Sequence, residues 1–137
     1  MLDTISIRTS GPGLYEITDR ISVLLPRQDG LLTALVRHTS CSLLIQENAD
    51  PDVQVDLRRY FERLVPRGDT PDMAWLTHVM EGPDDMPAHI KAAMLPVSLG
   101  IPVAAGRMML GTWQGIYLFE HRERPHTREI ALHFRGD

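Results

Sequence analysis

Apolar and polar residues alternate at both ends of the chain, and apolar residues recur with helical spacing in between. Residues 3–9 alternate weakly and predict a strand, which the Gly-Pro-Gly break at residues 11–13 ends. From Leu14 to Leu24 the apolar residues follow a helical repeat. This repeat predicts a helix that Pro26 closes.

Two further strands and the most regular helix are predicted between residues 31 and 66. Residues 31–47 form two apolar runs around the polar break His38-Thr39-Ser40, which predicts a hairpin or a sharp strand bend. Asp50 can cap a helix whose first residue is Pro51. One apolar stripe continues this helix to Pro66 and consists of Val53, Leu57, Tyr60, Phe61 and Leu64.

The second half of the chain combines a long loop with antiparallel strands. Residues 67–86 are rich in glycine, proline and aspartate and predict a loop, after which a short helix begins near Pro87. From Ile101 to the end the pattern predicts about three strands. Two to three helices among six or more strands favour an α+β fold with a largely antiparallel sheet assembly. The length fits a single domain over residues 1–137.

The strand predicted over Thr112–His121 carries mostly apolar residues on both faces. Helices, a second sheet or another subunit should therefore cover it on both sides. One face ends in Glu120 and the other in His121. A carboxylate in line with buried isoleucine and leucine needs a partner or a raised pKa, so Glu120 is a candidate site residue.

Composition limits the classes of function. The net charge is -4 with no block of basic residues, so nucleic acid is not an expected partner. The start, MLDTISIRTS, has no basic head or apolar run, and no later stretch has the length that spans a bilayer, so we expect a cytoplasmic protein without a membrane partner. The single cysteine excludes an internal disulfide, and a metal would need histidine and carboxylate ligands.

The segment HVMEGPDDMPAHIKA places acids and histidines directly before a predicted helix. The helix N-terminus and Lys91 suit an anion such as a phosphate. The acids Glu81, Asp84 and Asp85 suit a cation, so Mg²⁺ bridging a diphosphate is one interpretation. The alternative for the same acids is helix capping and a solvated loop.

Zinc is a second interpretation of the histidines. His78, His89 and His121 could bind Zn²⁺ together with Glu81 or Glu120, although no local spacing such as HExxH imposes this arrangement.

The polar break raises the question of a nucleophilic cysteine. Cys41 alternates with Leu43 on one strand face, which favours a packing role over nucleophilic catalysis. His38 ends a strand beside Thr39 and Ser40, whose hydroxyl groups could orient its ring. His38 is therefore a candidate for binding or catalysis.

Several segments resemble one family of small proteins. HTSCSLLIQENADPDVQVDL, EGPDDMPAHIKAAML and SLGIPVAAGRMMLGTWQGI are each similar to the matching segments of the YjbQ family, and the resemblance covers nearly the whole chain. It implies an α+β fold and a homotrimer with sites near subunit boundaries. The family usually has alanine where this chain has Cys41, which agrees with a packing role.

The resemblance also implies a reaction. It points to a secondary thiamine-phosphate synthase, which joins hydroxymethylpyrimidine diphosphate to a thiazole phosphate and releases diphosphate. Such chemistry needs charge neutralisation of the leaving group, for which Mg²⁺ or another divalent metal is expected. A metal-dependent hydrolase or lyase acting on another small metabolite, and a non-enzymatic metabolite-binding module, are the alternatives.

Three sets of candidate residues follow. The catalytic candidates are His38, His89 and Glu120. The substrate-binding candidates are Thr39, Ser40, Glu47, Asn48, Lys91, Arg107, Thr112, Trp113 and Gln114. The metal-binding candidates are His78, Glu81, Asp85, His89 and His121.

Overall fold

The computed structural model describes residues 1–137 and contains two antiparallel sheets and three helices. The larger sheet has the strand order β1 (Leu2–Thr9), β8 (His126–Gly136), β3 (Gly30–Val36), β5 (Ser98–Ala104) and β6 (Arg107–Met108). The smaller sheet has the order β2 (Gly13–Glu16), β7 (Gln114–Glu120) and β4 (Cys41–Glu47). The helices are α1 (Thr18–Ser22), α2 (Pro51–Leu64) and α3 (Asp85–Met94), with a 3₁₀ turn at Pro71–Met73. The predicted α+β fold with an antiparallel sheet assembly is confirmed.

The main core lies between the two sheets. Strand alternation turns Leu32 of β3 and Leu132 of β8 inward, while Thr33 and His133 between their buried neighbours stay exposed. Burying one such leucine contributes about 1.5–3 kcal/mol, so these two central strands hold much of the stability.

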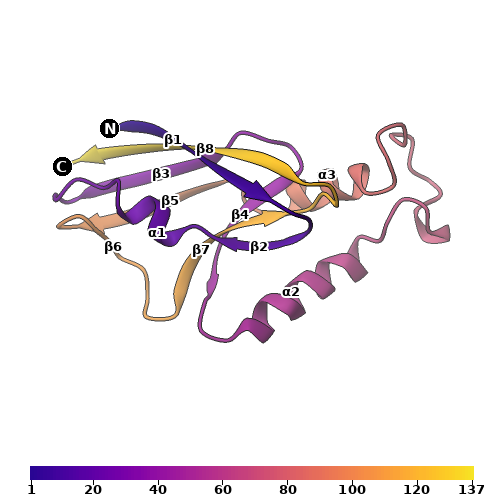
Figure 1. Ribbon diagram of the computed structural model, residues 1–137, viewed down its shortest axis with the longest axis horizontal. Coiled ribbons are helices and arrows are strands. Elements are labelled where there is room, and N and C mark those ends of the chain that lie inside the picture. Colours follow the sequence, from indigo (N-terminus) through magenta and orange to yellow (C-terminus); the bar gives the residue numbers. More distant parts are fainter.

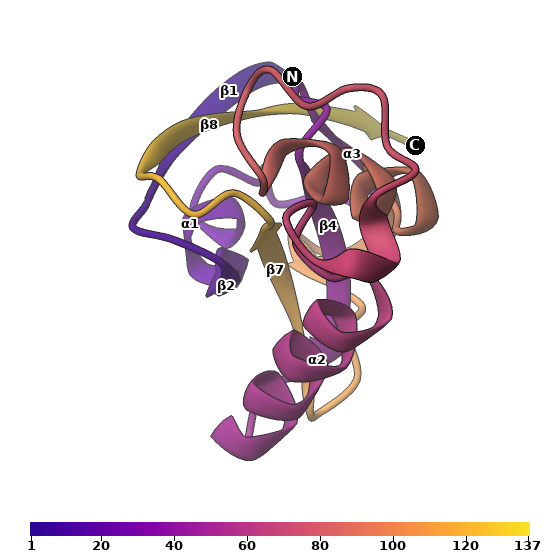
Figure 2. The same ribbon diagram turned by 90° about the vertical axis from the view of Figure 1, so that its right-hand side faces the viewer.

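Strand β7 is covered on both faces, as its sequence predicts. Six of its seven residues are buried. One face joins the core, and the opposite face meets α2, where the rings of Phe119 and Phe61 have centroids 5.8 Å apart. The amide of Gln54 on α2 donates to the hydroxyl of Tyr117 at 2.9 Å. Helix α2 buries no residue completely and projects away from the sheets (Figure 2).

The helix predicted from Leu14 to Leu24 is wrong in its first half. Residues Gly13–Glu16 form β2, with Leu14 opposite Phe119 of β7, and the helix that follows spans only Thr18–Ser22. Pairing with β7 satisfies the backbone groups of β2, and this tertiary contact overrides the local repeat. The hairpin alternative for residues 31–47 is also wrong, because β3 and β4 belong to different sheets and the polar break is a bend between them.

The other boundaries lie close to the predictions. Asp50 caps α2 by accepting a hydrogen bond from the amide of Asp52 at 2.9 Å. Helix α3 begins at Asp85 and follows the predicted loop, and β5 begins at Ser98, earlier than expected. In Figure 1 the loop between α2 and α3 extends beyond the end of the sheets. None of the helices combines the length and the apolar character that a bilayer-spanning segment requires.

Candidate functional site

Four side chains with metal-binding atoms meet at the start of α3. His78 and Glu81 come from the loop, and Asp85 and His89 lie one turn apart on α3. One ligand atom from each side chain lies within 4.8 Å of the others. This four-donor cluster contains four of the five residues that the sequence suggested for a metal.

Asp85 occupies the centre of the four-donor cluster. The residue is only 2% exposed. Its Oδ2 lies 2.7 Å from Nε2 of His78 and 3.2 Å from Nε2 of His89, while Oδ1 accepts from Arg122 at 2.6 Å. Burial by itself raises the pKa of Asp85, but the hydrogen bonds with His78 and Glu81 and the charge of Arg122 outweigh it and lower the pKa below its usual value. Asp85 is therefore a carboxylate.

The orientation of His89 is fixed by the backbone of the β3–β4 bend. Nδ1 of His89 lies 2.8 Å from the carbonyl oxygen of Thr39. A carbonyl oxygen only accepts hydrogen bonds, so Nδ1 carries the proton and Nε2 of a neutral ring presents its lone pair. That lone pair faces the carboxylate oxygen of Asp85. Two acceptors so placed repel each other unless His89 gains a second proton or a cation lies between them.

The donor set fits a divalent transition ion. A histidine whose Nδ1 donates to a carbonyl oxygen and whose Nε2 is free has the usual arrangement of a metal ligand. His78 shares its Nε2 proton with Asp85, and this hydrogen bond raises the pKa of His78. Two imidazoles with two carboxylates favour Zn²⁺ or a similar ion over Mg²⁺, which prefers oxygen ligands.

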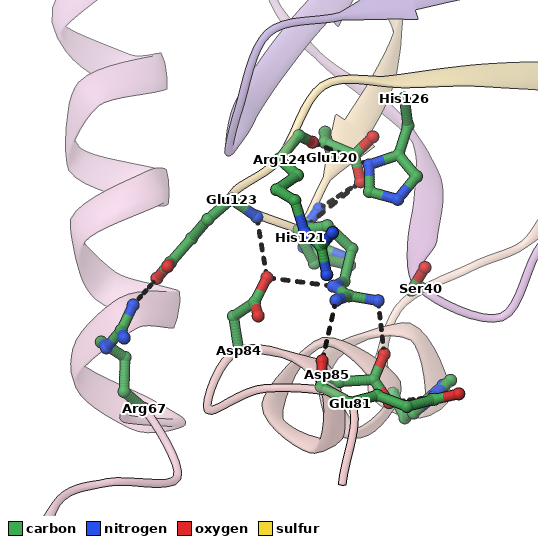
Figure 3. Close-up of polar contacts among 12 residues, drawn as sticks. Ser40, Arg67, Glu81, Asp84, Asp85, Glu120, His121, Glu123, Arg124 and His126 are labelled. Carbon is green, nitrogen blue, oxygen red and sulfur yellow. Dashed lines mark hydrogen bonds and ion pairs between the residues drawn. The ribbon is translucent and has the colours of Figure 1, made fainter.

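Arg122, which sequence reasoning did not single out, supports the four-donor cluster from the end of β7. Its Nε donates to Asp84 at 3.0 Å, and Nη2 donates to the carbonyl oxygen of Glu81 at 3.2 Å. Asp84 also accepts from the backbone amide of Glu123 at 2.9 Å (Figure 3). A cation directly after His121 was the only sequence signal for this role.

Two hollows flank the first turn of α3. The first has a volume of about 270 Å³ and lies beside His78 of the four-donor cluster. It is lined by Gly68, Asp69, Leu76, His78, Val79, Gly82, Pro83, Met86 and Pro87. The second has a volume of about 340 Å³ and includes Lys91 and His121. His121 thus lies outside the four-donor cluster, and its Nε2 is hydrogen-bonded to Oγ of Ser42 at 2.9 Å.

Glu120 lies between the sheets and lines neither hollow. It is fully buried, and its carboxylate accepts from Arg128 through both oxygens and from Thr9 at 2.6 Å. Burial raises the pKa of Glu120, but the hydrogen bonds from Arg128 and Thr9 outweigh this effect and lower it. Arg128 also donates to Oγ of Ser40 at 2.9 Å. These contacts describe an ion pair that joins β7, β8 and the β3–β4 bend.

The remaining residues of the polar break are also engaged within the fold. Nε2 of His38 accepts from the amide of Glu129 at 2.8 Å, and burial, assisted by the charge of Arg128, lowers the pKa of His38. Cys41 is fully buried, and burial raises the pKa of its thiol to about 12. A thiol in this state is a poor nucleophile, which supports the packing role.

The other substrate-binding candidates lie at the far end of the smaller sheet. Glu47 pairs with Gln114, whereas Cys41 pairs with Glu120 at the end nearer to α3. Six residues of strand separate these pairs by roughly 20 Å. Asn48 and Trp113 lie at the same end, because the amide of Asn48 donates to the carbonyl oxygen of Trp113 at 2.9 Å. Together with Glu47 and Gln114 they form the far group. Exposed Thr112 adjoins it, and exposed Arg107 lies in β6.

The fold and the four-donor cluster together describe a two-sheet α+β protein with a candidate metal centre. The family model of "UPF0047 protein YjbQ-like" matches residues 3–137. The chain is 48% identical over 134 residues to a UPF0047 protein of Synechocystis sp., covering 96% of this chain and 88% of that protein. It is 49% identical over 122 residues to the UPF0047 protein YjbQ of Salmonella typhimurium, covering 89% and 85%.

A solved structure agrees with these relatives. A conserved hypothetical protein of Thermus thermophilus superposes with a TM-score of 0.85 at 32% identity, covering 97% of this chain and 99% of that one. The chain belongs to the UPF0047/YjbQ-like family.

Proposed function

We propose that this protein is a metal-dependent enzyme that acts on a small phosphorylated molecule at the four-donor cluster. The observation that carries the proposal is the convergence of two imidazole Nε2 atoms on one oxygen of Asp85, with His89 held in its Nδ1-protonated form by Thr39. A bound divalent ion there supplies charge neutralisation for a phosphate or diphosphate group. The adjacent 270 Å³ hollow provides room for the organic part of a small substrate.

The residues of the chain have separable tasks in this proposal. His89 provides one nitrogen ligand, and His78 provides a second when it releases the proton that it shares with Asp85. Asp85 and Glu81 provide negative charge that raises affinity for a cation. Arg122 fixes the orientation of Asp85 from outside the cluster. The finer proposal, taken from the family resemblance, is the thiamine-phosphate synthase reaction, in which the ion would stabilise the departing diphosphate.

Elemental analysis and an activity assay test the proposal together. We expect purified protein reconstituted with Zn²⁺ or Mn²⁺ to bind about one ion per chain, and to make thiamine phosphate above background from both precursors. His89→Ala should lose both properties. The matched control is His133→Ala, because His133 is exposed on β8 and lies outside the four-donor cluster.

Two results would overturn the proposal. One is the same metal content in wild-type protein and His89→Ala, and the other is undiminished product formation by His89→Ala. Metal binding without turnover of these precursors would reject the thiamine-phosphate reaction alone.

A hydrolase or lyase is the second candidate, and the two imidazole ligands favour it. A Zn²⁺ ion held by His78, His89 and Asp85 would supply the activation of water that a hydrolase or lyase needs. A screen of phosphate esters with the reconstituted protein separates this activity from the transferase. A rise in melting temperature with a metabolite that is never turned over would favour a non-enzymatic binding module.

A homotrimer, implied by the family resemblance, would give the far group of candidate residues a role. Glu47 and Gln114 lie roughly 20 Å along the sheet from the end near α3, too far for both ends to bind one small molecule within a chain. A neighbouring subunit could bring its far group to the four-donor cluster. Light scattering coupled to size-exclusion chromatography measures the mass, and a monomeric mass would reject this arrangement.

A further inference from the structure

The only lysine of the chain is buried beside the second hollow. Lys91 is 8% exposed, and its ammonium group has no hydrogen-bond partner or carboxylate within ion-pair distance. Taking a cation largely out of water costs free energy unless an anion or a hydrogen-bond acceptor compensates its charge. We propose that this hollow, the lysine pocket, binds an oxyanion, either a phosphate or a carboxylate group, between Lys91 and His121.

The lysine pocket lies at the junction of three elements. Its volume is about 340 Å³, and its wall includes Glu62 at the end of α2, Lys91 on α3 and His121 after β7. Two independent polar side chains that are more than nine-tenths buried therefore reach the same hollow, since His121 is 3% exposed.

The lysine pocket contains no acid that pairs directly with Lys91. Its wall contains three acids, Glu62, Asp84 and Glu123, and each has an arginine partner. These partners are Arg58 for Glu62, Arg122 for Asp84 and Arg67 for Glu123. The contacts of Asp84 and Arg67 with Glu123 are visible in Figure 3. Two of these arginines also pair with a further acid, Arg122 with Asp85 and Arg67 with Asp69. None of the acids lies within ion-pair distance of Lys91, so a bound oxyanion would be its direct partner.

His121 provides the second donor. Its Nδ1 is the one buried side-chain nitrogen or oxygen atom without a hydrogen-bond partner. Burial and the nearby charge of Lys91 lower the pKa of His121 to about 3, so the ring is neutral at physiological pH. If the hydroxyl of Ser42 donates to Nε2, then Nδ1 carries the proton and can donate to the same oxyanion as Lys91.

The lysine pocket is separate from the four-donor cluster. Pro87 and Lys91 line the pocket from one side of α3, together with Asp84 directly before the helix. Asp85 and His89 lie on a different side of that helix. Oxyanion binding in the pocket therefore does not depend on a metal ion, and each proposal can fail without the other.

Because Lys91 is the only lysine, one NMR signal reports on the pocket. We expect protein labelled with ¹³C and ¹⁵N in lysine to show a single ammonium signal that shifts saturably when inorganic phosphate or acetate is added at constant ionic strength in chloride. Separate titrations with the two probes show whether phosphate or carboxylate is preferred. Chelator is present throughout, so that the four-donor cluster contributes nothing.

Variants show whether the two residues act together. Lys91→Met replaces the lysine by an uncharged side chain of similar length. The fold should be retained, but the preferred anion should no longer raise the melting temperature of the protein. His121→Leu should weaken anion binding about tenfold, and His121→Asn, which keeps a donor near the Nδ1 position, should recover part of it. The control is Arg135→Gln, because Arg135 is an exposed cation on β8 outside the pocket.

Two outcomes would overturn the inference. One is a lysine signal that does not saturate with either probe. The other is anion stabilisation of Lys91→Met equal to that of the wild type.

Discussion

His89 donates a hydrogen bond from Nδ1 to the carbonyl oxygen of Thr39 at 2.8 Å, and this bond directs its Nε2 toward Asp85. The backbone of the bend between the two sheets thus sets the tautomer of a side chain on α3. The bend residues His38, Thr39 and Ser40 were expected to provide side chains to a site. Thr39 contributes its carbonyl group to the four-donor cluster instead.

Arg122 should tune metal affinity without binding the metal. Arg122→Gln removes the guanidinium that fixes Asp85, so we expect affinity for Zn²⁺ to fall about 10–100-fold. Competition with a chromophoric chelator measures this change. Arg124→Gln is the matched control, because Arg124 is exposed nearby and its side chain makes no hydrogen bond. Equal affinities for the two variants would reject the positioning role.

Glu120 should matter for stability rather than for the chemistry. Glu120→Gln leaves the buried guanidinium of Arg128 without its charge partner, and we expect a loss of about 3–5 kcal/mol in the free energy of unfolding. Urea unfolding measures this loss, and metal content at low temperature should stay at the wild-type value. Glu120→Leu combined with Arg128→Met should recover part of the stability. An unchanged unfolding free energy with lost turnover would instead make Glu120 catalytic.

His121 should make the protein less stable in mild acid. Its pKa is lowered to about 3 in the fold, so between the unfolded value near 6.5 and pH 3 the unfolded chain binds the extra proton. Stability from this residue therefore falls as pH falls, by up to about 1.4 kcal/mol per pH unit. His78 has the opposite sign, because its pKa is raised and its stabilisation disappears as pH rises through the raised value.

Chemical denaturation at pH 7 and pH 5 measures the effect of His121. The difference between the two unfolding free energies should shrink in His121→Asn, whatever the cost of the substitution itself. His126→Asn is the control, because His126 begins β8 and is only half-buried. The same pH difference in wild type and His121→Asn would show that His121 is not buried as a neutral ring.

Cys41 should be unreactive in the folded protein. With a pKa near 12 and no exposure, its thiol should not react with a thiol reagent at pH 8 until the protein unfolds. Cys41→Ala should cost about 1 kcal/mol in stability and leave metal binding unchanged. Rapid labelling of the native protein, or loss of metal in Cys41→Ala, would contradict the packing role.

Local sequence predicted those features that depend on local chemistry. The residue types at Asp50 and Pro51 predicted the cap of α2, and the apolar residues on both faces of β7 predicted that both faces are covered. His78, Glu81, Asp85 and His89 could be grouped because they lie within twelve residues of each other, across a turn and the start of one helix. Short sequence separation restricts how far such side chains can lie from one another.

Contacts between residues far apart in the sequence determined the other features of the fold and of the sites. Leu14 lies in a strand because β7 is beside it, although the local repeat favours a helix. Arg122 binds Asp85, which lies 37 residues earlier in the sequence, and Lys91 and His121 line one pocket although 30 residues separate them. Their sequence positions alone could not indicate these contacts. Glu47 and Glu120, both candidates for one site, lie near opposite ends of the same strand pair. Strand register and helix packing set these distances, and both arise only when the whole chain folds.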